Sequence, residues 1–381
     1  MYNFYYEQPV PIDFGADRIK DLPTILEKYK FQKGLLISAP SMVRNGVAQK
    51  IMDASNGKIK AIFSNIQPNP TVQNTDDCVE ALVEHKCDFA IALGGGSILD
   101  CAKVACFVAT TSYTTEVYFT KQQPITHKGL PLIAVPTTSG TASEITNVSV
   151  LTDTKRGIKA PLASEFLYPI YALVDPMLTL SCPQQVTASS GLDVLAHSLE
   201  AFYGKKHQPY TDLAAEYAAK LVFENLLVAY HAPNNLEARI NMSLASVTAG
   251  MAFNLTQTAA AHACSYPLTQ NFGVPHGEAC ALTLATFWKL NSIGKESKRL
   301  EAFSRRLGFE DSIDLANRID EMKKDMQMCL TIEEAGVKTE EDLKLLVANS
   351  FAPNMQNNPV DVTPELLENL YKSISSIHSN S

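Results

Sequence analysis

The fold is decided by the stretch Phe89-Ala90-Ile91-Ala92-Leu93-Gly94-Gly95-Gly96-Ser97-Ile98-Leu99-Asp100-Cys101-Ala102-Lys103. It opens on an apolar run typical of a buried parallel strand, passes through three glycines, and continues as a helix. Glycines let a backbone approach a pyrophosphate, and a helix N-terminus supplies oriented N–H groups for it. The stretch is not a GxGxxG fingerprint, so a tight strand-to-helix turn without a ligand remains the alternative interpretation.

The residues on either side of this stretch repeat the same alternation. Three more buried strands and three helices are expected: strands at 34–38, 61–64 and 131–135, and helices near 41–55, 72–86 and 97–109. Strands that alternate with helices indicate βαβ units and a mostly parallel sheet. Apolar runs at 148–152 and 171–174 predict further strands at an edge.

A second polar loop, Pro136 to Glu144, also follows a predicted strand. Polar loops at the carboxyl ends of neighbouring parallel strands form the crevice in which α/β sheets bind ligands. Two such loops favour a nucleotide site over an ordinary Ser/Thr turn. The segment that contains Asn69 would end the second strand and could face the ribose or adenine.

The pattern changes near residues 178–182, and no strand is predicted beyond them. Helices are expected near 184–203, 210–228, 234–254, 277–293, 297–308, 312–327, 339–349 and 363–376. We therefore predict an α/β dinucleotide-binding domain over 1–179 and an all-helical metal-binding domain over 180–381.

Four residues of the second half point to a metal. Asp193 and His197 share one helix face because they are four residues apart, while His262 lies in a small, apolar stretch and His276 in Pro275-His276-Gly277. Each alone has a simpler interpretation, as a helix cap or a hydrogen-bonded core histidine. Together, one carboxylate and three imidazoles favour a divalent metal, Fe²⁺ or Zn²⁺.

Composition excludes several classes of function. The 381 residues carry a net charge of −8 that is spread along the chain, which argues against nucleic-acid or anionic-membrane partners. The eight cysteines show no CxxC pair and the first residues no signal peptide, which predicts a reducing, cytoplasmic setting. No apolar run reaches the ~18 residues of a membrane span.

Over nearly its whole length the chain resembles the iron-containing (group III) alcohol dehydrogenases. The stretch from Gly94 to Lys103 is similar to that family's GGGSxxDxxK loop, and Pro136 to Glu144 to its PTTxGTGSE loop. Ala142 stands where glycine is usual in the second loop. Three more similarities follow in order: GxDAxxHxxEAY at 191–202, AGxAF at 249–253, and the histidines His262 and His276.

The resemblance implies a dinucleotide domain, a helical metal domain and an active site in the cleft between them, in an assembly that is commonly a dimer or larger. The implied metal ligands are Asp193, His197, His262 and His276. The residues implied to hold the pyrophosphate and nicotinamide half are Gly94, Gly95, Gly96, Ser97, Thr137 and Thr138. Lys159 matches a family lysine near the cofactor ribose, and Phe253 would line the substrate pocket.

Two departures from the family pattern matter. Many members have a histidine, often assigned to proton relay, where this chain has Tyr266. Tyr266 could replace it as a proton donor or only shape the pocket. NAD-preferring members often carry Asp at the strand end where this chain has Ala39, with Ser41 and Arg44 nearby. NADPH is therefore not repelled, although we expect NAD(H) ahead of NADP(H).

The resemblance implies reduction of a short aldehyde to a primary alcohol. The sequence around Tyr266 is similar to branches that reduce two-carbon aldehydes with an anionic head, sulfoacetaldehyde or phosphonoacetaldehyde. Lys205, Lys206 and His207 could hold such a head or simply form a solvated helix end. A general short-chain alcohol or diol dehydrogenase stays open, as does a lyase that uses NAD transiently, like 3-dehydroquinate synthase.

Overall fold

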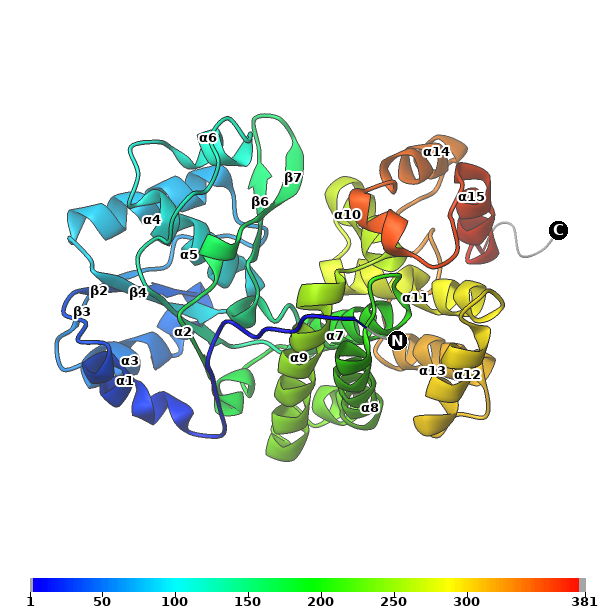
Figure 1. The fold of residues 1–381 in the computed structure, drawn as a ribbon, viewed down its shortest axis with the longest axis horizontal. Helices are drawn as coiled ribbons and strands as arrows, with labels where there is room; N and C mark the ends of the chain where they lie inside the picture. The colour runs from blue at the N-terminus through cyan, green and yellow to red at the C-terminus, as the bar shows by residue number, and fades with distance from the viewer. Residues whose placement is uncertain (1–2, 377–381) are drawn as a thin grey trace. The chain divides into compact units, whose positions relative to one another are not determined.

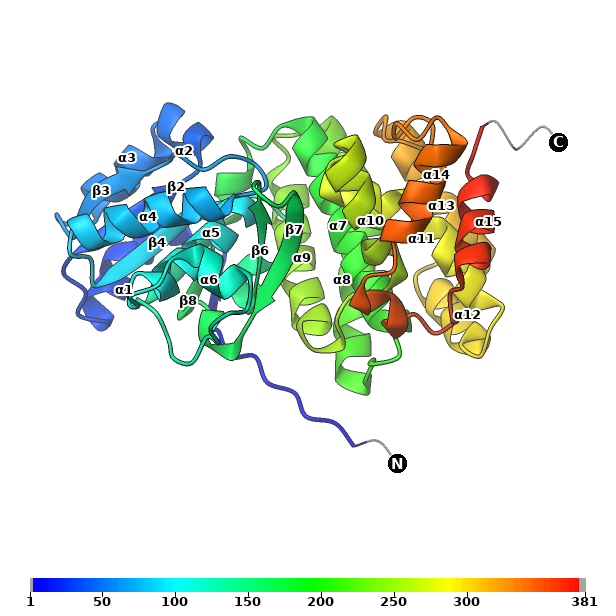
Figure 2. The ribbon, with the colours of Figure 1, turned by 90° about the horizontal axis from the view of Figure 1, so that it is seen from above.

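The computed structural model describes residues 3–376 and divides into two compact units. One unit comprises Glu7–Ser181, and the other comprises Cys182 onward together with the residues up to Tyr6. The sequence places the division after residue 179, two residues earlier. Each unit has its own arrangement of elements, as Figures 1 and 2 show.

The first unit is built on a six-stranded parallel sheet, which confirms the predicted α/β class. Its order is β1-β8-β5-β4-β2-β3, from Ile12–Phe14, Tyr171–Val174, Leu132–Pro136, Phe89–Gly94, Gly34–Ser38 and Ile59–Phe63. The strand predicted at 171–174 forms, but its predicted edge position is wrong, because β1 pairs along its outer side. The sequence misses β1, which has only three residues, all partly exposed.

Helices cover both faces of this sheet. They are α1 (Leu22–Lys28), α2 (Pro40–Arg44), α3 (Val47–Ala54), α4 (Val72–Glu84) and α5 (Gly96–Val108). A short helix, α6 (Thr115–Phe119), packs on α4, α5 and the hairpin strand β7 (Ile158–Ala163). Alternate residues of β4 enter different cores: Ile91 and Leu93 pack with residues of α1 and α3, while Ala90 and Ala92 pack with α4 and α5. A strand that is buried on both faces must be apolar throughout, as this one is.

A separate antiparallel hairpin carries β6 (Val148–Asp153) and β7 (Ile158–Ala163). The expectation that 148–152 adds an edge strand to the main sheet is therefore wrong, since β6 pairs with β7 instead. Residues along β6 alternate between partly exposed and buried, as expected for a strand with only one covered face.

The second unit contains helices and, among its described residues, no strand. Its helices are α7 (Gln184–Tyr203), α8 (Pro209–His231), α9 (Leu236–Thr256), α10 (Ala260–Phe272), α11 (His276–Ser292), α12 (Ser297–Arg306), α13 (Ser312–Asp325), α14 (Glu340–Asn349) and α15 (Pro364–Ser373). Helix α7 is buried almost throughout its last four turns, from Gly191 to Tyr203. Eight of these helices match the prediction, while α10, which contains Pro267, was not predicted.

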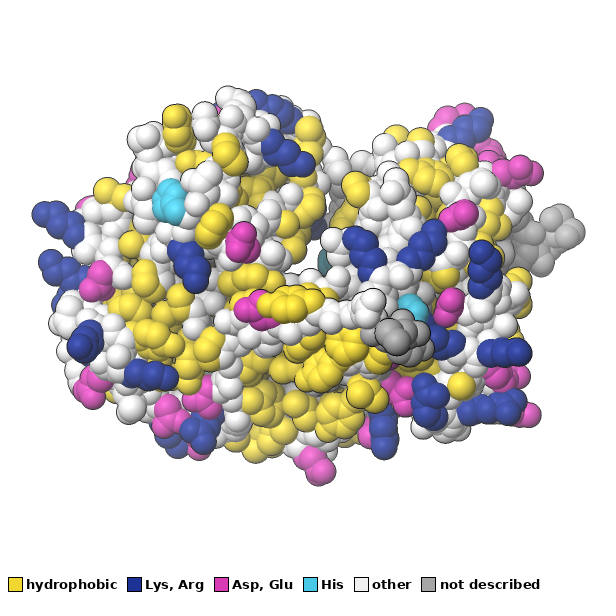
Figure 3. Space-filling model, in the orientation of Figure 1, with side chains coloured by type: hydrophobic (Ala, Val, Ile, Leu, Met, Phe, Trp, Pro, Cys, Tyr) yellow, Lys and Arg dark blue, Asp and Glu magenta, His cyan; other side chains and the backbone are white. Residues whose placement is uncertain are grey.

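The surface of the helical unit is mixed in character. Figure 3 shows hydrophobic side chains over α8 and α9, with acidic and basic side chains distributed around them. Tyr210, Leu213 and Tyr217 of α8 contribute exposed apolar surface. The ring of Tyr6 packs against that of Tyr210, with 4.1 Å between centroids. Within the described residues, no helix is both long and apolar enough to cross a membrane.

Candidate metal centre and dinucleotide site

Helix α7 carries three buried polar residues on one face. Asp193, His197 and Glu200 follow one another at spacings of four and three residues, and each is at most 5% exposed. A helix with polar groups buried among Leu192, Leu195 and Leu199 is costly unless each group finds a partner. The sequence singled out the first two residues, and Glu200 is the third member of the same pattern.

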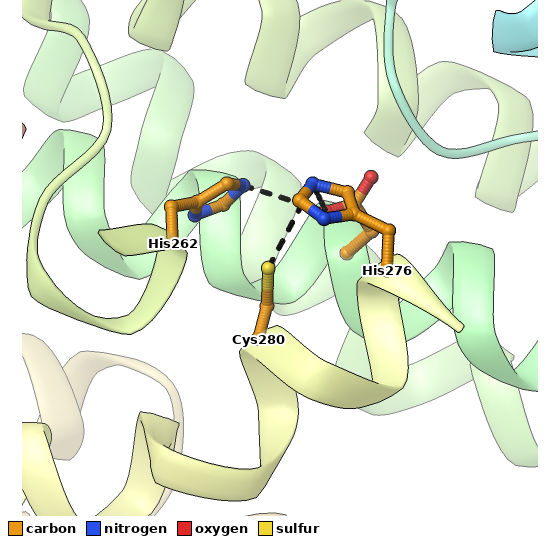
Figure 4. Close-up of side chains that lie close together, drawn as sticks. His262, His276 and Cys280 are labelled. Atoms are coloured by element: carbon orange, nitrogen blue, oxygen red, sulfur yellow. Dashed lines mark hydrogen bonds and ion pairs between the residues drawn. The ribbon is translucent and has the colours of Figure 1, made fainter. Parts of the chain in front are cut away.

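The predicted ligands converge around Asp193. Its Oδ1 atom lies 3.5 Å from Nε2 of His262, 3.8 Å from Nε2 of His276 and 3.9 Å from Nδ1 of His197. Figure 4 shows His262 and His276 pointing toward one another from α10 and α11. Asp193 and His276 are 83 positions apart in the sequence, yet the fold brings them within reach of one ion.

A divalent cation fits this cluster. Asp193 Oδ1 and His262 Nε2 are buried, and neither has a hydrogen-bond partner among the residues described. Unsatisfied buried polar atoms are rare and call for an ion or water. Burial alone would raise the pKa of Asp193, but the neighbouring imidazoles of His197, His262 and His276 hold that pKa well below its usual range. The carboxylate is therefore anionic, as a metal ligand must be.

Two further residues orient the imidazoles. His262 places Nδ1 2.5 Å from Glu200 Oε2, and its backbone N–H donates to Oε1 of the same carboxylate at 3.1 Å. His276 Nδ1 lies 3.3 Å from the hydroxyl of Ser265. These contacts occupy each Nδ1 and leave Nε2 for Asp193 and a cation. Carboxylate–histidine pairs of this kind fix ring orientation at metal sites.

A cysteine that the sequence analysis passed over lies in the cluster. Ligand atoms of Asp193, His262, His276 and Cys280 all lie within 4.8 Å of one another. Cys280 is four residues after His276, one helical turn along α11, which is the signal that could have revealed it. His197 is beside this group, with its ring centroid 4.5 Å from that of His262.

Aromatic side chains adjoin the cluster. Phe253 of α9 stacks on His197 at 4.0 Å between centroids, with an angle of 12° between the rings. Tyr266 of α10 lies parallel to His276 at 6.4 Å. Burial raises the pKa of Tyr266, so its hydroxyl keeps its proton at neutral pH.

In the α/β unit, the two predicted loops lie side by side. Strands β4 and β5 are neighbours, and the N–H of Thr137 donates to the carbonyl of Gly94 at 3.0 Å. A Cβ on Gly95 would lie 3.1 Å from Thr138 Oγ1, and one on Gly96 would lie 2.8 Å from Thr141 Cγ2. Glycine therefore favours the close approach of the two loops at the start of α5, and the helix N-terminus there can receive a pyrophosphate.

Three further predicted cofactor residues meet at this edge of the unit. Lys159 of β7 donates from Nζ to Asn69 Oδ1 at 2.8 Å, and the backbone N–H of Asn69 donates to Ser97 Oγ at 3.2 Å. Asn69 adopts a left-handed backbone with φ of 56°, which asparagine tolerates better than most residues. The geometry brings the hairpin, the segment after β3 and the glycine loop together.

A buried network that the sequence analysis did not assign fixes the hairpin to α5. Asp100 accepts from Ser143 Oγ at 2.6 Å and from the N–H of Val150 at 2.9 Å. Lys103 donates from Nζ to the Val148 carbonyl at 2.8 Å, and burial lowers its pKa to about 8. Asp100 and Lys103 lie three residues apart, about one turn of α5, and this spacing of two charged residues on an apolar helix is the sequence signal for the network.

The candidate anion-binding residues do not converge. Lys205 pairs with Asp361 at 2.8 Å, Lys206 donates to Gln257 Oε1 at 2.5 Å, and His207 lies 3.2 Å from Asp212. Each side chain is directed to a different partner. The geometry favours the interpretation of this segment as a solvated helix end.

The metal cluster of the helical unit and the glycine loop of the α/β unit are the two sites that a metal-dependent, dinucleotide-linked dehydrogenase needs. Comparison with known proteins places the chain among such dehydrogenases. The model of iron-containing alcohol dehydrogenases matches residues 9–176, and that of the C-terminal part of Fe-containing alcohol dehydrogenases matches residues 187–375. The chain belongs to the iron-containing alcohol dehydrogenase family, and it is an oxidoreductase.

Relatives of this chain act on small alcohols and aldehydes. A crystal structure of sulfoacetaldehyde reductase from Bifidobacterium kashiwanohense in complex with NAD⁺ is 41% identical, covers 99% of this chain and 100% of that one, and has a TM-score of 0.96. The sulfoacetaldehyde reductase of Bilophila wadsworthia is 30% identical over 91% of this chain and 92% of its own. The 1-propanol dehydrogenase of Salmonella typhimurium is 37% identical over 65% of this chain and 64% of its own.

Proposed function

We propose that this protein reduces a short aldehyde to a primary alcohol with NAD(H) and a divalent metal, and that its aldehyde carries an anionic head, as sulfoacetaldehyde does. The observation that carries the proposal is the 41% identity to a sulfoacetaldehyde reductase over almost the entire chain. The similarity at Tyr266 noted in the sequence points to the same branch.

The metal site is assigned to Asp193, His197, His262 and His276, with Fe²⁺ or Zn²⁺ as the ion. When bound, the ion supplies Lewis-acid polarisation of a carbonyl, and the reduced dinucleotide supplies hydride. Glu200 holds His262 in the orientation that aims Nε2 at Asp193. Asp193 is the anionic member of this proposed ligand set, and the imidazoles of His262 and His276 both face its carboxylate.

The remaining roles fall to aromatic groups beside the ligands. Phe253 lines the substrate pocket, where its stacking on His197 holds it beside the ligands. Tyr266 donates the proton that the product alkoxide requires, since it is close to His276 and its raised pKa keeps the hydroxyl protonated.

The cofactor site is assigned to the glycine loop, to Thr137 and Thr138, and to Asn69 and Lys159. NAD(H) is expected ahead of NADP(H). The absence of a carboxylate at Ala39 leaves NADPH as a weaker alternative. All eight cysteines are free, which supports a cytoplasmic setting, and we expect a homodimer or larger homo-oligomer.

A second candidate is a general short-chain alcohol or diol dehydrogenase. The identity to a 1-propanol dehydrogenase favours it, and so do the separate partners of Lys205, Lys206 and His207. The lyase hypothesis has no supporting observation of this kind.

The test is oxidation of NADH and NADPH by metal-loaded protein with sulfoacetaldehyde, phosphonoacetaldehyde, propionaldehyde and lactaldehyde. The proposal expects kcat/KM for an anionic aldehyde to exceed the neutral ones by ~10²-fold, or about 2.7 kcal/mol of transition-state discrimination. A preference for the neutral aldehydes supports the second candidate instead.

A further inference from the structure

The side chain of Cys280 is part of the metal cluster by position. It is completely buried, and its Sγ lies 3.9 Å from Nε2 of His276. Figure 4 shows the thiol aimed at the space between His262 and His276. The family pattern in the sequence assigns it no role.

The distances are those of a ligand set. Around a five-coordinate ion with bonds of 2.0–2.3 Å, adjacent nitrogen, oxygen and sulfur ligands are about 2.8–3.7 Å apart. The recorded separations are 3.5 Å for Asp193 to His262, 3.8 Å for Asp193 to His276, and 3.9 Å for His276 to Cys280. All pairs of ligand atoms in the group lie within 4.8 Å, so an ion at their centre would draw the side chains closer together.

A second observation is independent of the cysteine. Asp193 Oδ1 and His262 Nε2, each in a residue only 3% exposed, lack a hydrogen-bond partner among the described residues. Both residues belong to the same group as Cys280, in which the ligand atoms lie within 4.8 Å of one another. Two buried polar atoms without hydrogen-bond partners and a buried thiol around one point are better explained by a shared cation than by three separate packing accidents.

We propose that the Cys280 thiolate is a ligand of the metal, beside Asp193, His262 and His276. The inference deepens the proposed function, because it concerns the same centre. As the sulfur–metal bond forms, the thiol proton passes to solvent and no electrons are transferred. The Cys280 sulfur is a ligand in addition to His197, which stays next to Asp193.

A sulfur ligand changes which metals the site accepts. Soft thiolates favour Zn²⁺ and Fe²⁺, whereas carboxylate and water ligands suit Mg²⁺ and Mn²⁺. The centre should therefore discriminate strongly against Mg²⁺ and Mn²⁺, and part of that discrimination should come from Cys280.

The test is X-ray absorption of the full-length protein loaded with Zn²⁺, with Cys280→Ser as the variant. The wild type should show a sulfur scatterer at about 2.3 Å in addition to nitrogen and oxygen at about 2.0–2.1 Å. The sulfur shell should vanish in Cys280→Ser and remain in Cys264→Ser. Cys264 is the matched control, because it is equally buried but its thiol is in hydrogen-bond contact with Tyr371 and Ser350.

A wild-type spectrum with only nitrogen and oxygen neighbours overturns the inference, and so does a sulfur shell that survives in Cys280→Ser. Zn²⁺ affinity should fall by ~10-fold or more in that variant while Mn²⁺ affinity stays the same. Circular dichroism checks folding, and Cys280→Ala provides a second variant if the serine protein fails to fold. Scattering requires no turnover, so a failure of the aldehyde assays leaves this test intact.

Discussion

Replacing Glu200 should weaken metal binding without touching a ligand. The carboxylate is fully buried and bonds both Nδ1 and the backbone N–H of His262. Glu200→Gln keeps an oxygen that can accept from the ring but removes the charge. Glu200→Ala also leaves the ring N–H without an acceptor.

The expected magnitude follows from these contacts. A hydrogen bond to a charged group contributes roughly 1.5–3 kcal/mol. Loss of a residue that orients a ligand typically lowers metal affinity by about 10–100-fold. We therefore expect Zn²⁺ affinity to fall by about tenfold in Glu200→Gln and about 100-fold in Glu200→Ala. The metal-free protein should lose stability as well, because removing one partner of a buried pair leaves His262 without its carboxylate.

The assay is competition for Zn²⁺ against a chromophoric chelator at fixed pH. The control is Glu278→Gln, since Glu278 is also buried on a helix of this unit but accepts from the N–H of Cys329 at 2.8 Å. The reasoning fails if the alanine variant binds Zn²⁺ as tightly as the glutamine variant. It fails equally if Glu278→Gln loses as much affinity as either.

Three other outcomes are expected. Burial raises the pKa of Glu144 from 4.5 to about 7. Between pH 4.5 and 7 the folded protein therefore keeps a proton on Glu144 that the unfolded chain has lost. The free energy of unfolding should fall by roughly 1–3 kcal/mol as the pH rises through this window. Chemical denaturation at pH 4.5 and 7.5 should show this loss shrinking in Glu144→Gln, and equal losses would contradict the assignment. Ala39→Asp places a carboxylate at the end of β2 and should lower kcat/KM with NADPH ~10-fold relative to NADH, in steady-state assays with both cofactors; an unchanged ratio means that Ala39 does not face the 2′ position. Asp193→Ala should retain no metal by elemental analysis and should lose the drop in Tm that a chelator produces in the wild type; stoichiometric metal in the variant would remove Asp193 from the ligand set.

Much of the fold could be predicted because its signals are local. The strand at 89–94 is apolar throughout, and the stop at glycine marks where it ends. The strand at 148–152 was predicted, but its pairing with β7 in a separate hairpin was not. Strand β1 escaped prediction because it is short and its partner β8 is about 160 residues away. Helix α10 was missed because small residues and Pro267 blur its periodicity, while its end at Gly273 follows from a left-handed φ of 72°.

The candidate site was predicted less completely. Asp193 and His197 stand out because one helix face carries both, but the convergence of His262 and His276 on Asp193 is a tertiary fact. Cys280 was passed over among eight scattered cysteines, although its spacing of four residues from His276 on a predicted helix was a usable signal. The spacing of Asp100 and Lys103 on one helix marks the pair, but Val150, the partner of Asp100, lies 50 residues further along the chain and cannot be found from spacing.

The helical unit is discontinuous in the sequence, since residues up to Tyr6 belong to it while the rest begins at Cys182. During synthesis, the aromatic ring at position 6 emerges long before its partner at position 210. At about 5–20 residues per second, that delay is roughly 10–40 s, during which the α/β unit can form first. The opening segment therefore has to wait for the start of α8 before its native contacts in the helical unit can form.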